Sequence, residues 1–208
     1  MKKAASSGDS IRLFATQTDW AAWLAKNHRE SQGLWLRLAK KGSKVQSVTY
    51  GEALEIALCY GWIDGQKSGE SKQAWLQRFL PRTATSLWSK INRDKALALI
   101  ASRRMKAAGL QAIETAKKNG RWDAAYDSPS GAKIPGDFQA ALDASSKALE
   151  FFQSLDSANR YAILFRIQTV KKAETRARKI REFVEMLQRN ERIHETRTTR
   201  RASKITRS

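Results

Sequence analysis

The sequence contains few of the residues that build disulfides and metal centres. Its 208 residues include one cysteine, Cys59, and two histidines, His28 and His194. A single cysteine cannot form an internal disulfide, which fits a reducing compartment, and the apolar run around Cys59 is typical of a buried structural thiol. These three residues lie too far apart in the sequence to suggest a zinc site. We therefore predict no metal and no cofactor.

Motifs of the common catalytic and nucleotide-binding classes are also missing. The sequence contains no P-loop, no dinucleotide-binding glycine pattern and no G-x-S-x-G element. Glu52 and Glu55 lie three residues apart, and helix capping and solvent exposure explain them better than paired acid-base chemistry. These absences favour a binding protein over an enzyme.

The sequence has no hydrophobic run long enough to cross a membrane. No apolar stretch approaches the roughly 20 residues that a membrane helix needs. The first eight residues are basic but lack the apolar segment of a signal peptide. We therefore expect a soluble, cytoplasmic protein without a transmembrane segment.

Acidic residues are scarce relative to basic ones. Thirty-nine Lys and Arg stand against 20 Asp and Glu, which gives a net charge of +19. Such an excess favours anionic partners, namely nucleic acid, anionic lipid headgroups or acidic proteins. The alternative is that the charge serves only solubility. A core can still form, because the chain is 41% hydrophobic and carries seven Trp and seven Phe.

Hydrophobic periodicity predicts an α+β domain over residues 18–125, after a flexible N-terminus at residues 1–17. Apolar residues recur at helical spacing from about Thr18 to Asn27. From Leu34 to Ala39 leucines alternate with other residues, which is the period of a strand with one aliphatic face.

Three further helices are predicted in this domain from their start and stop signals, and the last of them runs from Ala107 to Asn119 and is stopped by Gly120. Thr49 and Glu52 have the spacing of a capping box, and Gly61 is placed to end the helix that follows. That helix is apolar nearly all round, so we expect it to be central and buried. Thr85 or Ser86 is expected to cap the next helix.

A hairpin is predicted between these helices. Its first strand is 62–64, its turn is Gly65 to Gly69, and its second strand is 73–79, with Pro81 ending it. Together with the strand at 34–39, this predicts a small antiparallel sheet packed by helices.

The composition changes twice in the C-terminal part. Residues 126–136 are rich in Pro, Gly and Ser and predict a linker. Residues 137–190 carry helical patterns throughout and predict an all-helical C-terminal domain. Residues 191–208 have no apolar periodicity and predict a disordered basic tail.

The window from Lys72 to Lys106 combines basic and aromatic residues. It contains nine Lys and Arg and a single acid, Asp94. Guanidinium groups can bind an anion through paired hydrogen bonds, and an indole can stack on a base. The alternative is that the aromatic residues form the core and the charges form a solvated face.

In the overlapping stretch from Gly61 to Asn92 we predict a concave ligand-binding site around a stiff segment. Pro81 fixes its own φ and biases the preceding residue toward an extended form, so the flanking Arg78 and Arg82 have restricted freedom. Asp64 is either the partner of Arg78 across the hairpin or an acid or base. The predicted ligand-binding residues are Trp62, Asp64, Arg78, Arg82, Trp88 and Asn92.

Several of these segments resemble a known family, the YdeI/OmpD-associated or bacteriocin-protection proteins. The resemblance runs from about Trp20 to His194. Its motifs are Ala57-Leu58-Cys59-Tyr60-Gly61-Trp62-Ile63-Asp64-Gly65, Arg78-Phe79-Leu80-Pro81-Arg82, Ser86-Leu87-Trp88-Ser89-Lys90-Ile91-Asn92, Gly120-Arg121-Trp122 and Lys171-Lys172-Ala173-Glu174-Thr175-Arg176.

The resemblance implies a role in stress or bacteriocin protection, without implying a catalytic residue or a cofactor. With the charge, it favours a non-enzymatic binder of an anionic ligand or nucleic acid. Two alternatives stay open. One is an enzyme that acts on a small anionic substrate through Asp64, Arg78 and Arg82. The other is a protein-interaction module.

Overall fold

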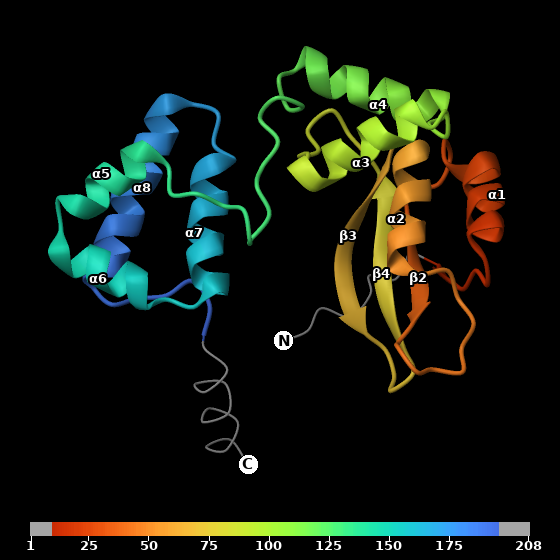
Figure 1. The fold of residues 1–208 in the computed structure, drawn as a ribbon, viewed down its shortest axis with the longest axis horizontal. Helices are drawn as coiled ribbons and strands as arrows, with labels where there is room; N and C mark the ends of the chain where they lie inside the picture. Colours follow the sequence, from red (N-terminus) through yellow and green to blue (C-terminus); the bar gives the residue numbers. More distant parts are fainter. Residues whose placement is uncertain (1–9, 196–208) are drawn as a thin grey trace. The chain divides into compact units, whose positions relative to one another are not determined.

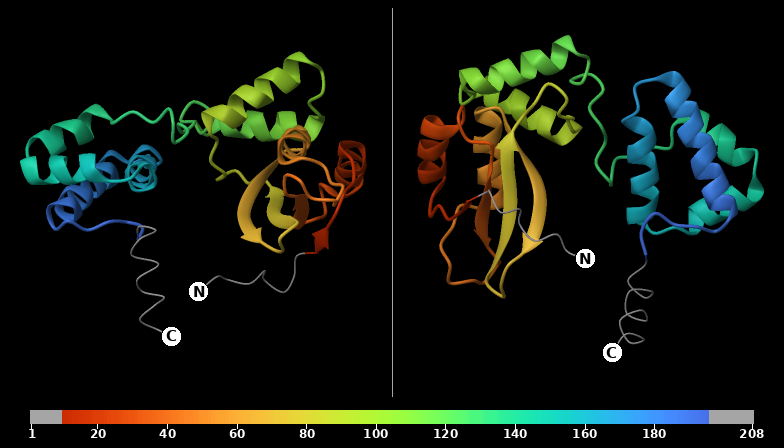
Figure 2. Two further views of the ribbon diagram at one scale, coloured as in Figure 1. Left: turned by 60° about the horizontal axis from the view of Figure 1, so that its bottom comes forward. Right: turned by 180° about the vertical axis from the view of Figure 1, so that it is seen from behind.

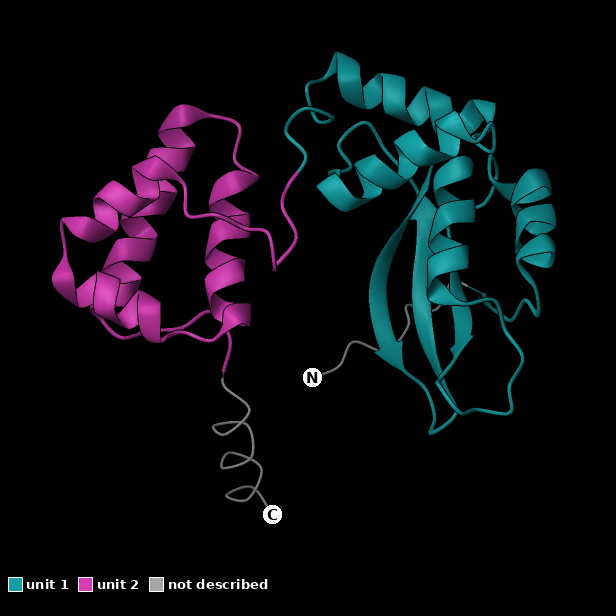
Figure 3. Cartoon of the chain, in the orientation of Figure 1, with its two compact units in different colours: residues 1–125 teal, residues 126–208 magenta. Residues whose placement is uncertain are grey.

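The computed structural model describes residues 10–195, and it divides into two compact units, residues 1–125 and 126–208 (Figures 1 and 3). The first unit contains a sheet with helices, and the second is helical. The predicted α+β class, with a helical C-terminal part, is therefore confirmed.

The sheet of the first unit has four strands in the order β1-β2-β4-β3. Strand β4 pairs antiparallel with both β2 and β3, whereas the short β1 pairs parallel with β2, so the sheet is mixed rather than wholly antiparallel. The strands are β1 (Ile11–Arg12), β2 (Leu34–Ala39), β3 (Trp62–Gly69) and β4 (Ala74–Pro81).

Strand β1 lies inside the segment predicted to be flexible. Its backbone pairing extends to Ser10, whose carbonyl accepts a hydrogen bond from the Trp35 amide at 3.0 Å. A pair of only two residues has no alternation for sequence analysis to detect, because a pattern of period two needs a longer run.

The predicted turn at Gly65 to Gly69 is wrong, because β3 continues through these residues to Gly69. The glycine-rich part is instead an irregularity in the ladder between Asp64 and Lys67. The buried Gln77 stabilises it, since its amide nitrogen donates to the carbonyls of Gly65 at 3.0 Å and Gln66 at 3.2 Å. Glycine here indicated a bulge rather than a reversal.

Two of the four helices of the first unit begin with the capping boxes of Thr16 and Thr49. The start predicted at Thr85 or Ser86 is wrong. Ser86 accepts the Thr83 amide in a turn, and Ser89 caps the helix instead. The helices are α1 (Gln17–Asn27), α2 (Tyr50–Cys59), α3 (Lys90–Ala101) and α4 (Ala107–Lys118).

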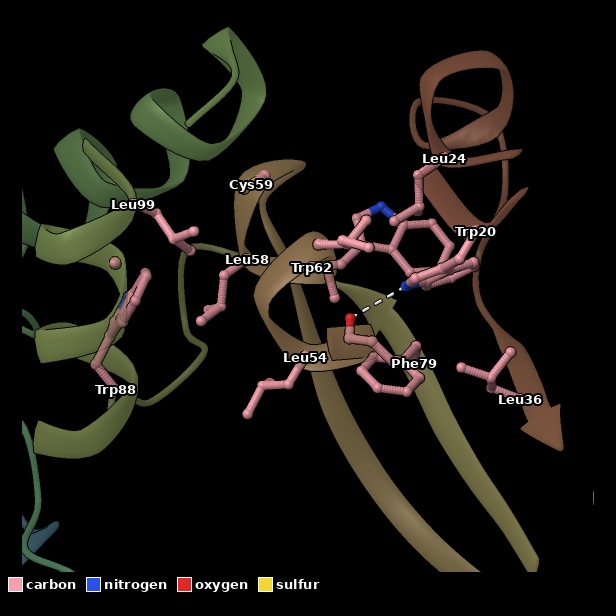
Figure 4. Close-up of a cluster of buried hydrophobic side chains, with 14 of the residues drawn as sticks. Trp20, Leu24, Leu36, Leu54, Leu58, Cys59, Trp62, Phe79, Trp88 and Leu99 are labelled. Atoms are coloured by element: carbon pink, nitrogen blue, oxygen red, sulfur yellow. Dashed lines mark hydrogen bonds between the residues drawn. The ribbon is translucent and has the colours of Figure 1, made fainter. Parts of the chain in front are cut away.

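Helix α2 lies against one face of the sheet, and the core of the first unit forms there (Figure 2). Trp20 of α1 is fully buried, and its indole donates to the Ala53 carbonyl of α2 at 3.1 Å (Figure 4). The ring of Trp20 stacks on Trp23 and meets Trp62 and Phe79 edge-on or tilted. The tryptophans here are therefore core residues.

The second unit consists of four helices around a separate core of apolar residues. Asp156 caps the third of them, where it accepts the Asn159 amide at 2.8 Å. The helices are α5 (Gly136–Asp143), α6 (Ser146–Ser154), α7 (Ser157–Gln168) and α8 (Ala173–Gln188).

The predicted disordered tail begins too early. Asn159 donates to the His194 carbonyl at 3.1 Å and accepts the His194 amide at 2.8 Å, so this part of the chain is held on α7. The rest of the predicted tail, residues 196–208, lies outside the described residues. Over residues 10–195, no helix has the length and apolar character to span a membrane, and no cluster of His, Cys, Asp or Glu could hold a metal ion.

Gly109 sets the distance between α4 and the end of α2. A Cβ atom there would lie 2.5 Å from the Cys59 carbonyl oxygen and 2.8 Å from that of Leu58, closer than packed atoms tolerate. We expect Gly109→Ala to lower the free energy of unfolding by about 3 kcal/mol, because the two helices must separate. All seven tryptophans lie in this unit, so denaturant unfolding followed by tryptophan fluorescence measures the loss.

The matched control is Gly51→Ala in α2, where a Cβ atom would meet nothing within 4 Å. The alanine there should be neutral or should stabilise by up to about 1 kcal/mol through helix propensity. Equal losses from both variants would contradict the close-approach explanation.

Arg176 connects three helices of the second unit. Its guanidinium donates to both carboxylate oxygens of Asp137, at 2.6 and 2.9 Å, and to the Ile167 carbonyl at the end of α7, at 2.8 Å. We expect Arg176→Gln to cost about 2 kcal/mol, because charge-assisted hydrogen bonds are lost from a half-exposed site. Hydrogen exchange of α8 amides measures this loss.

The neighbouring Arg178 is the control, since it is 64% exposed and its ion pair with Glu182 spans 3.6 Å. Arg178→Gln should change little. A pH series gives a second test, because the hydrogen bond from Arg176 lowers the pKa of Asp137. The interaction between Arg176 and Asp137 therefore stabilises the fold fully at pH values above the ordinary pKa of an aspartate, and this stabilisation is lost as pH falls below about 4. Arg176→Gln should remove that loss.

Candidate anion-binding site

A cavity of about 340 Å³ lies between one face of α4 and the open end of the β3–β4 hairpin, where β3 begins and β4 ends. We call it the Arg82 cavity. The polar or conformationally special residues that line it are His28, Arg29, Tyr60, Gly61, Arg82, Thr83, Gln111 and Thr115.

Gly61 makes this cavity possible by two properties that only glycine combines. Its φ of 73° ends α2 and turns the chain into β3, a conformation that side-chain-bearing residues rarely adopt. A Cβ atom there would also lie 2.8 Å from the Ala108 carbonyl of α4. The Gly61 carbonyl accepts the Arg82 amide at 2.9 Å, which joins the start of β3 to the chain after β4.

The Arg82 side chain is held in a fixed orientation. Its Nη1 donates to the Leu87 carbonyl at 3.0 Å, and its guanidinium carbon lies 3.6 Å from the centre of the Trp88 ring. Trp88 is itself buried and packs edge-on against Trp122, with ring centres 4.8 Å apart. A cation held by these contacts loses little freedom when it binds an anion.

His28 and Arg29 come from the end of α1. The Nδ1 atom of His28 lies 2.8 Å from the Leu24 carbonyl oxygen, so this nitrogen carries a hydrogen and donates it. Arg29 is exposed, and its side chain makes no hydrogen bond or ion pair with the residues that the structure describes. It is therefore available to a ligand.

The electrostatic character of the cavity follows from its lining. Its charged residues are Arg29 and Arg82, its histidine is His28, and no Asp or Glu lines it. Burial raises the pKa of the Tyr60 hydroxyl, so this group stays protonated and can donate a hydrogen bond. The cavity therefore offers donors and positive charge, the combination that stabilises an anion.

The predicted site residues fall into separate places. Trp62 and Arg82 line the cavity. Trp88 packs against the Arg82 guanidinium from the core and does not line the cavity. The buried Asn92 lies in the first turn of α3, where its backbone amide donates to the Ser89 hydroxyl. Arg82, Trp88 and Asn92 were predicted to share one concave surface, but of these three residues only Arg82 lines the cavity.

Asp64 and Arg78 lie on opposite faces of the hairpin. Asp64 pairs with Phe79 across the ladder, so its side chain shares the Phe79 face, and the adjacent Arg78 points the other way. Asp64 accepts the Tyr50 hydroxyl at 2.8 Å, whereas Arg78 Nη1 donates to Gln66 at 3.3 Å. This arrangement disagrees with the alternative in which Asp64 pairs with Arg78 across the hairpin, and neither residue lines the cavity.

Six polar residues of the lining were not predicted from the sequence. Thr83 follows β4 directly, and the other five are His28, Arg29, Tyr60, Gln111 and Thr115. These five come from the ends of α1 and α2 and from one face of α4. No local motif joins these segments, because only the packing of α4 on Gly61 places them together.

The chain thus consists of an α+β unit, which contains the Arg82 cavity, and a helical unit. Residues 12–112 match the model of a domain of unknown function, DUF8412. Residues 132–190 match the family described as bacteriocin-protection, YdeI or OmpD-associated. The predicted resemblance is thus confirmed for the helical unit, as a partial but direct family match. No curated protein and no solved structure matches the chain.

Arg82 contributes to folding as well as lining the cavity. We expect Arg82→Gln to lower the free energy of unfolding by about 2 kcal/mol, because the bond to Leu87 and the stacking on Trp88 are both lost. Arg29→Gln should leave stability unchanged, since that side chain is exposed. Tryptophan fluorescence in a denaturant series measures both variants. Full stability of Arg82→Gln would contradict the role assigned to these contacts.

Proposed function

We propose that the protein binds a small anionic ligand in the Arg82 cavity and catalyses no reaction on it. The observation that carries the proposal is the lining, in which arginine and histidine are present and carboxylates are absent. A cavity lined by cationic and neutral polar side chains, with no carboxylate in the lining, favours an anion from solution.

The size and rigidity of the site support a small ligand. A volume of about 340 Å³ falls within the range of small-molecule pockets. The guanidinium of Arg82 is held in place by Leu87 and Trp88 before any ligand arrives. Thr83, Gln111 and Thr115 add neutral polar groups that can orient a ligand through hydrogen bonds.

The enzyme alternative is less well supported by this geometry. It relied on Asp64 acting beside Arg78 and Arg82, yet Asp64 accepts a hydrogen bond from Tyr50 and does not line the cavity. A general base must reach the proton it removes, and Asp64 lies outside the lining. The description of the family that matches residues 132–190 names bacteriocin protection. We propose that ligand binding serves this protection or a stress response, and that it takes place in the cytoplasm.

The experiment that tests the proposal is calorimetric titration of the full chain with inorganic phosphate and pyrophosphate. We expect saturable binding that Arg29→Gln weakens by about tenfold or more, because one charge-assisted hydrogen bond is lost. Binding should also weaken as salt concentration rises, since the ligand and the lining carry opposite charges.

Arg78→Gln is the matched control, since it also removes one positive charge, but from a β4 side chain that does not line the cavity. It should leave phosphate affinity unchanged. If Arg29→Gln and Arg78→Gln weaken binding equally, the anion is attracted by net charge alone, and the proposal fails.

A further inference from the structure

A second cavity, of about 500 Å³, adjoins the first, because Tyr60 lines both. Three basic residues of the loop between α3 and α4 line it, namely Arg103, Arg104 and Lys106. No Asp or Glu is part of its lining. Each cavity thus has its own group of basic residues, and Tyr60 belongs to both linings.

The loop holds Arg103 in a conformation that arginine rarely adopts. Its φ is 57°, and its amide donates to the Ile100 carbonyl at 2.9 Å while the Arg104 amide donates to Leu99 at 3.0 Å. This hydrogen-bond pattern ends a helix, and the residue in the left-handed position is usually glycine. An arginine there costs stability, so a function of its side chain would explain its presence.

Of the three basic residues that line the second cavity, only Arg104 has an acidic partner among residues 10–195. Glu55 of α2 forms an ion pair with Arg104 at 3.0 Å and with Lys95 at 3.7 Å. The side chains of Arg103 and Lys106 form no ion pair or hydrogen bond with any residue in 10–195. Both are exposed, so these two cations are the ones available to a ligand in the second cavity.

We propose that the two cavities form one continuous groove that binds single-stranded nucleic acid. One backbone phosphate lies at Arg29 and Arg82, a second lies at Arg103 and Lys106, and a base packs against the Tyr60 ring between them. Alternation of basic groups with an aromatic platform is the arrangement by which proteins bind single strands without reading sequence. This inference rests on the proposed function, because the first phosphate occupies the Arg82 cavity.

Single-stranded nucleic acid fits this groove better than a duplex does. In a duplex the bases are stacked inside and cannot pack on a tyrosine ring that lines the cavities, whereas a single strand exposes both its phosphates and its bases. The net charge of +19 favours the same partner, since it attracts polyanions over a long range.

Arg103→Gly tests the groove, because it removes a proposed phosphate contact without a cost in folding stability. Glycine fits the left-handed position, so this variant should be as stable as the parent or more stable in tryptophan-monitored unfolding. It should nevertheless bind labelled oligothymidylate more weakly, with the salt dependence of log affinity reduced by about 0.7, the slope for one phosphate contact on a single strand. Fluorescence anisotropy with oligonucleotides of about two to eight nucleotides measures both, and affinity should rise with length and then level off as both cavities fill.

Asn190→Gly is the matched control, because Asn190 occupies the same left-handed position after α8, with φ of 59°. It should not change oligonucleotide affinity. Arg78→Gln controls for the loss of one positive charge, because Arg78 lines neither cavity, and it should retain the oligonucleotide affinity of the parent. Unchanged oligonucleotide affinity of Arg103→Gly, or tighter binding of a duplex of equal length, would overturn the proposal.

Inorganic phosphate distinguishes this inference from the proposed function. Arg103→Gly should retain the phosphate affinity of the parent, whereas Arg29→Gln should lose affinity for phosphate and for oligonucleotide. Phosphate binding without any dependence of oligonucleotide affinity on length or on Arg103 would leave the Arg82 cavity in place and refute the groove. Absence of phosphate binding would refute both.

Discussion

The close approach of α4 to the end of α2 is the constraint on which the first unit depends. Gly61 and Gly109 face the backbone of the opposite helix, and a Cβ atom at either position would lie within 3 Å of a carbonyl oxygen. The Lys106 amide donates to the Cys59 carbonyl at 3.2 Å and fixes the first turn of α4 on the last turn of α2. Without this contact, neither cavity beside Tyr60 would have its second wall.

The same contact explains why the basic residues gather where they do. Helix α4 begins directly after the loop that carries Arg103, and its side faces Arg82 and the end of α1. Core packing against α2 therefore determines the position of charges that take no part in the core. Five of the seven tryptophans are buried and have the opposite role, because they fill the interior. They are Trp20, Trp35, Trp62, Trp88 and Trp122.

In the second unit, the hydrogen-bonded ion pair between Arg176 and Asp137 connects the helices. Arg176 joins the first turn of α5 to the end of α7 from its place on α8. It belongs to the basic motif by which the chain resembles the bacteriocin-protection family, and this motif therefore has a structural explanation that needs no ligand. A charged motif in a basic protein is thus not sufficient evidence for a binding surface.

Sequence analysis predicted the features that local physics determines. The strand from Leu34 to Ala39, the capping box at Thr49 and the stop at Gly61 all agree with the structure, because alternation, capping and left-handed glycine act over a few residues. It failed where pairing over distance decides the outcome. The bulge after Asp64 was mistaken for a turn because glycine suits both structures.

The candidate site could be predicted only in part for the same reason. Arg82 and Trp62 were selected from one stiff and aromatic segment, and both line the cavity. Asp64 and Arg78 were included because they are near in sequence, but the alternation of a strand directs them to opposite faces. Arg29, Tyr60 and Gln111 could not be found at all, because no sequence pattern records that three helices meet at one place.

The central claim is that an anion occupies the Arg82 cavity, and an NMR titration of the full chain with inorganic phosphate tests it most directly. The account predicts saturable shifts of the Arg82 side-chain Nε–H signal and of the backbone amides of Arg29, Gly61 and Thr83, with a common dissociation constant. Shifts that do not saturate, or that spread evenly over lysines and arginines far from the cavity, would contradict it.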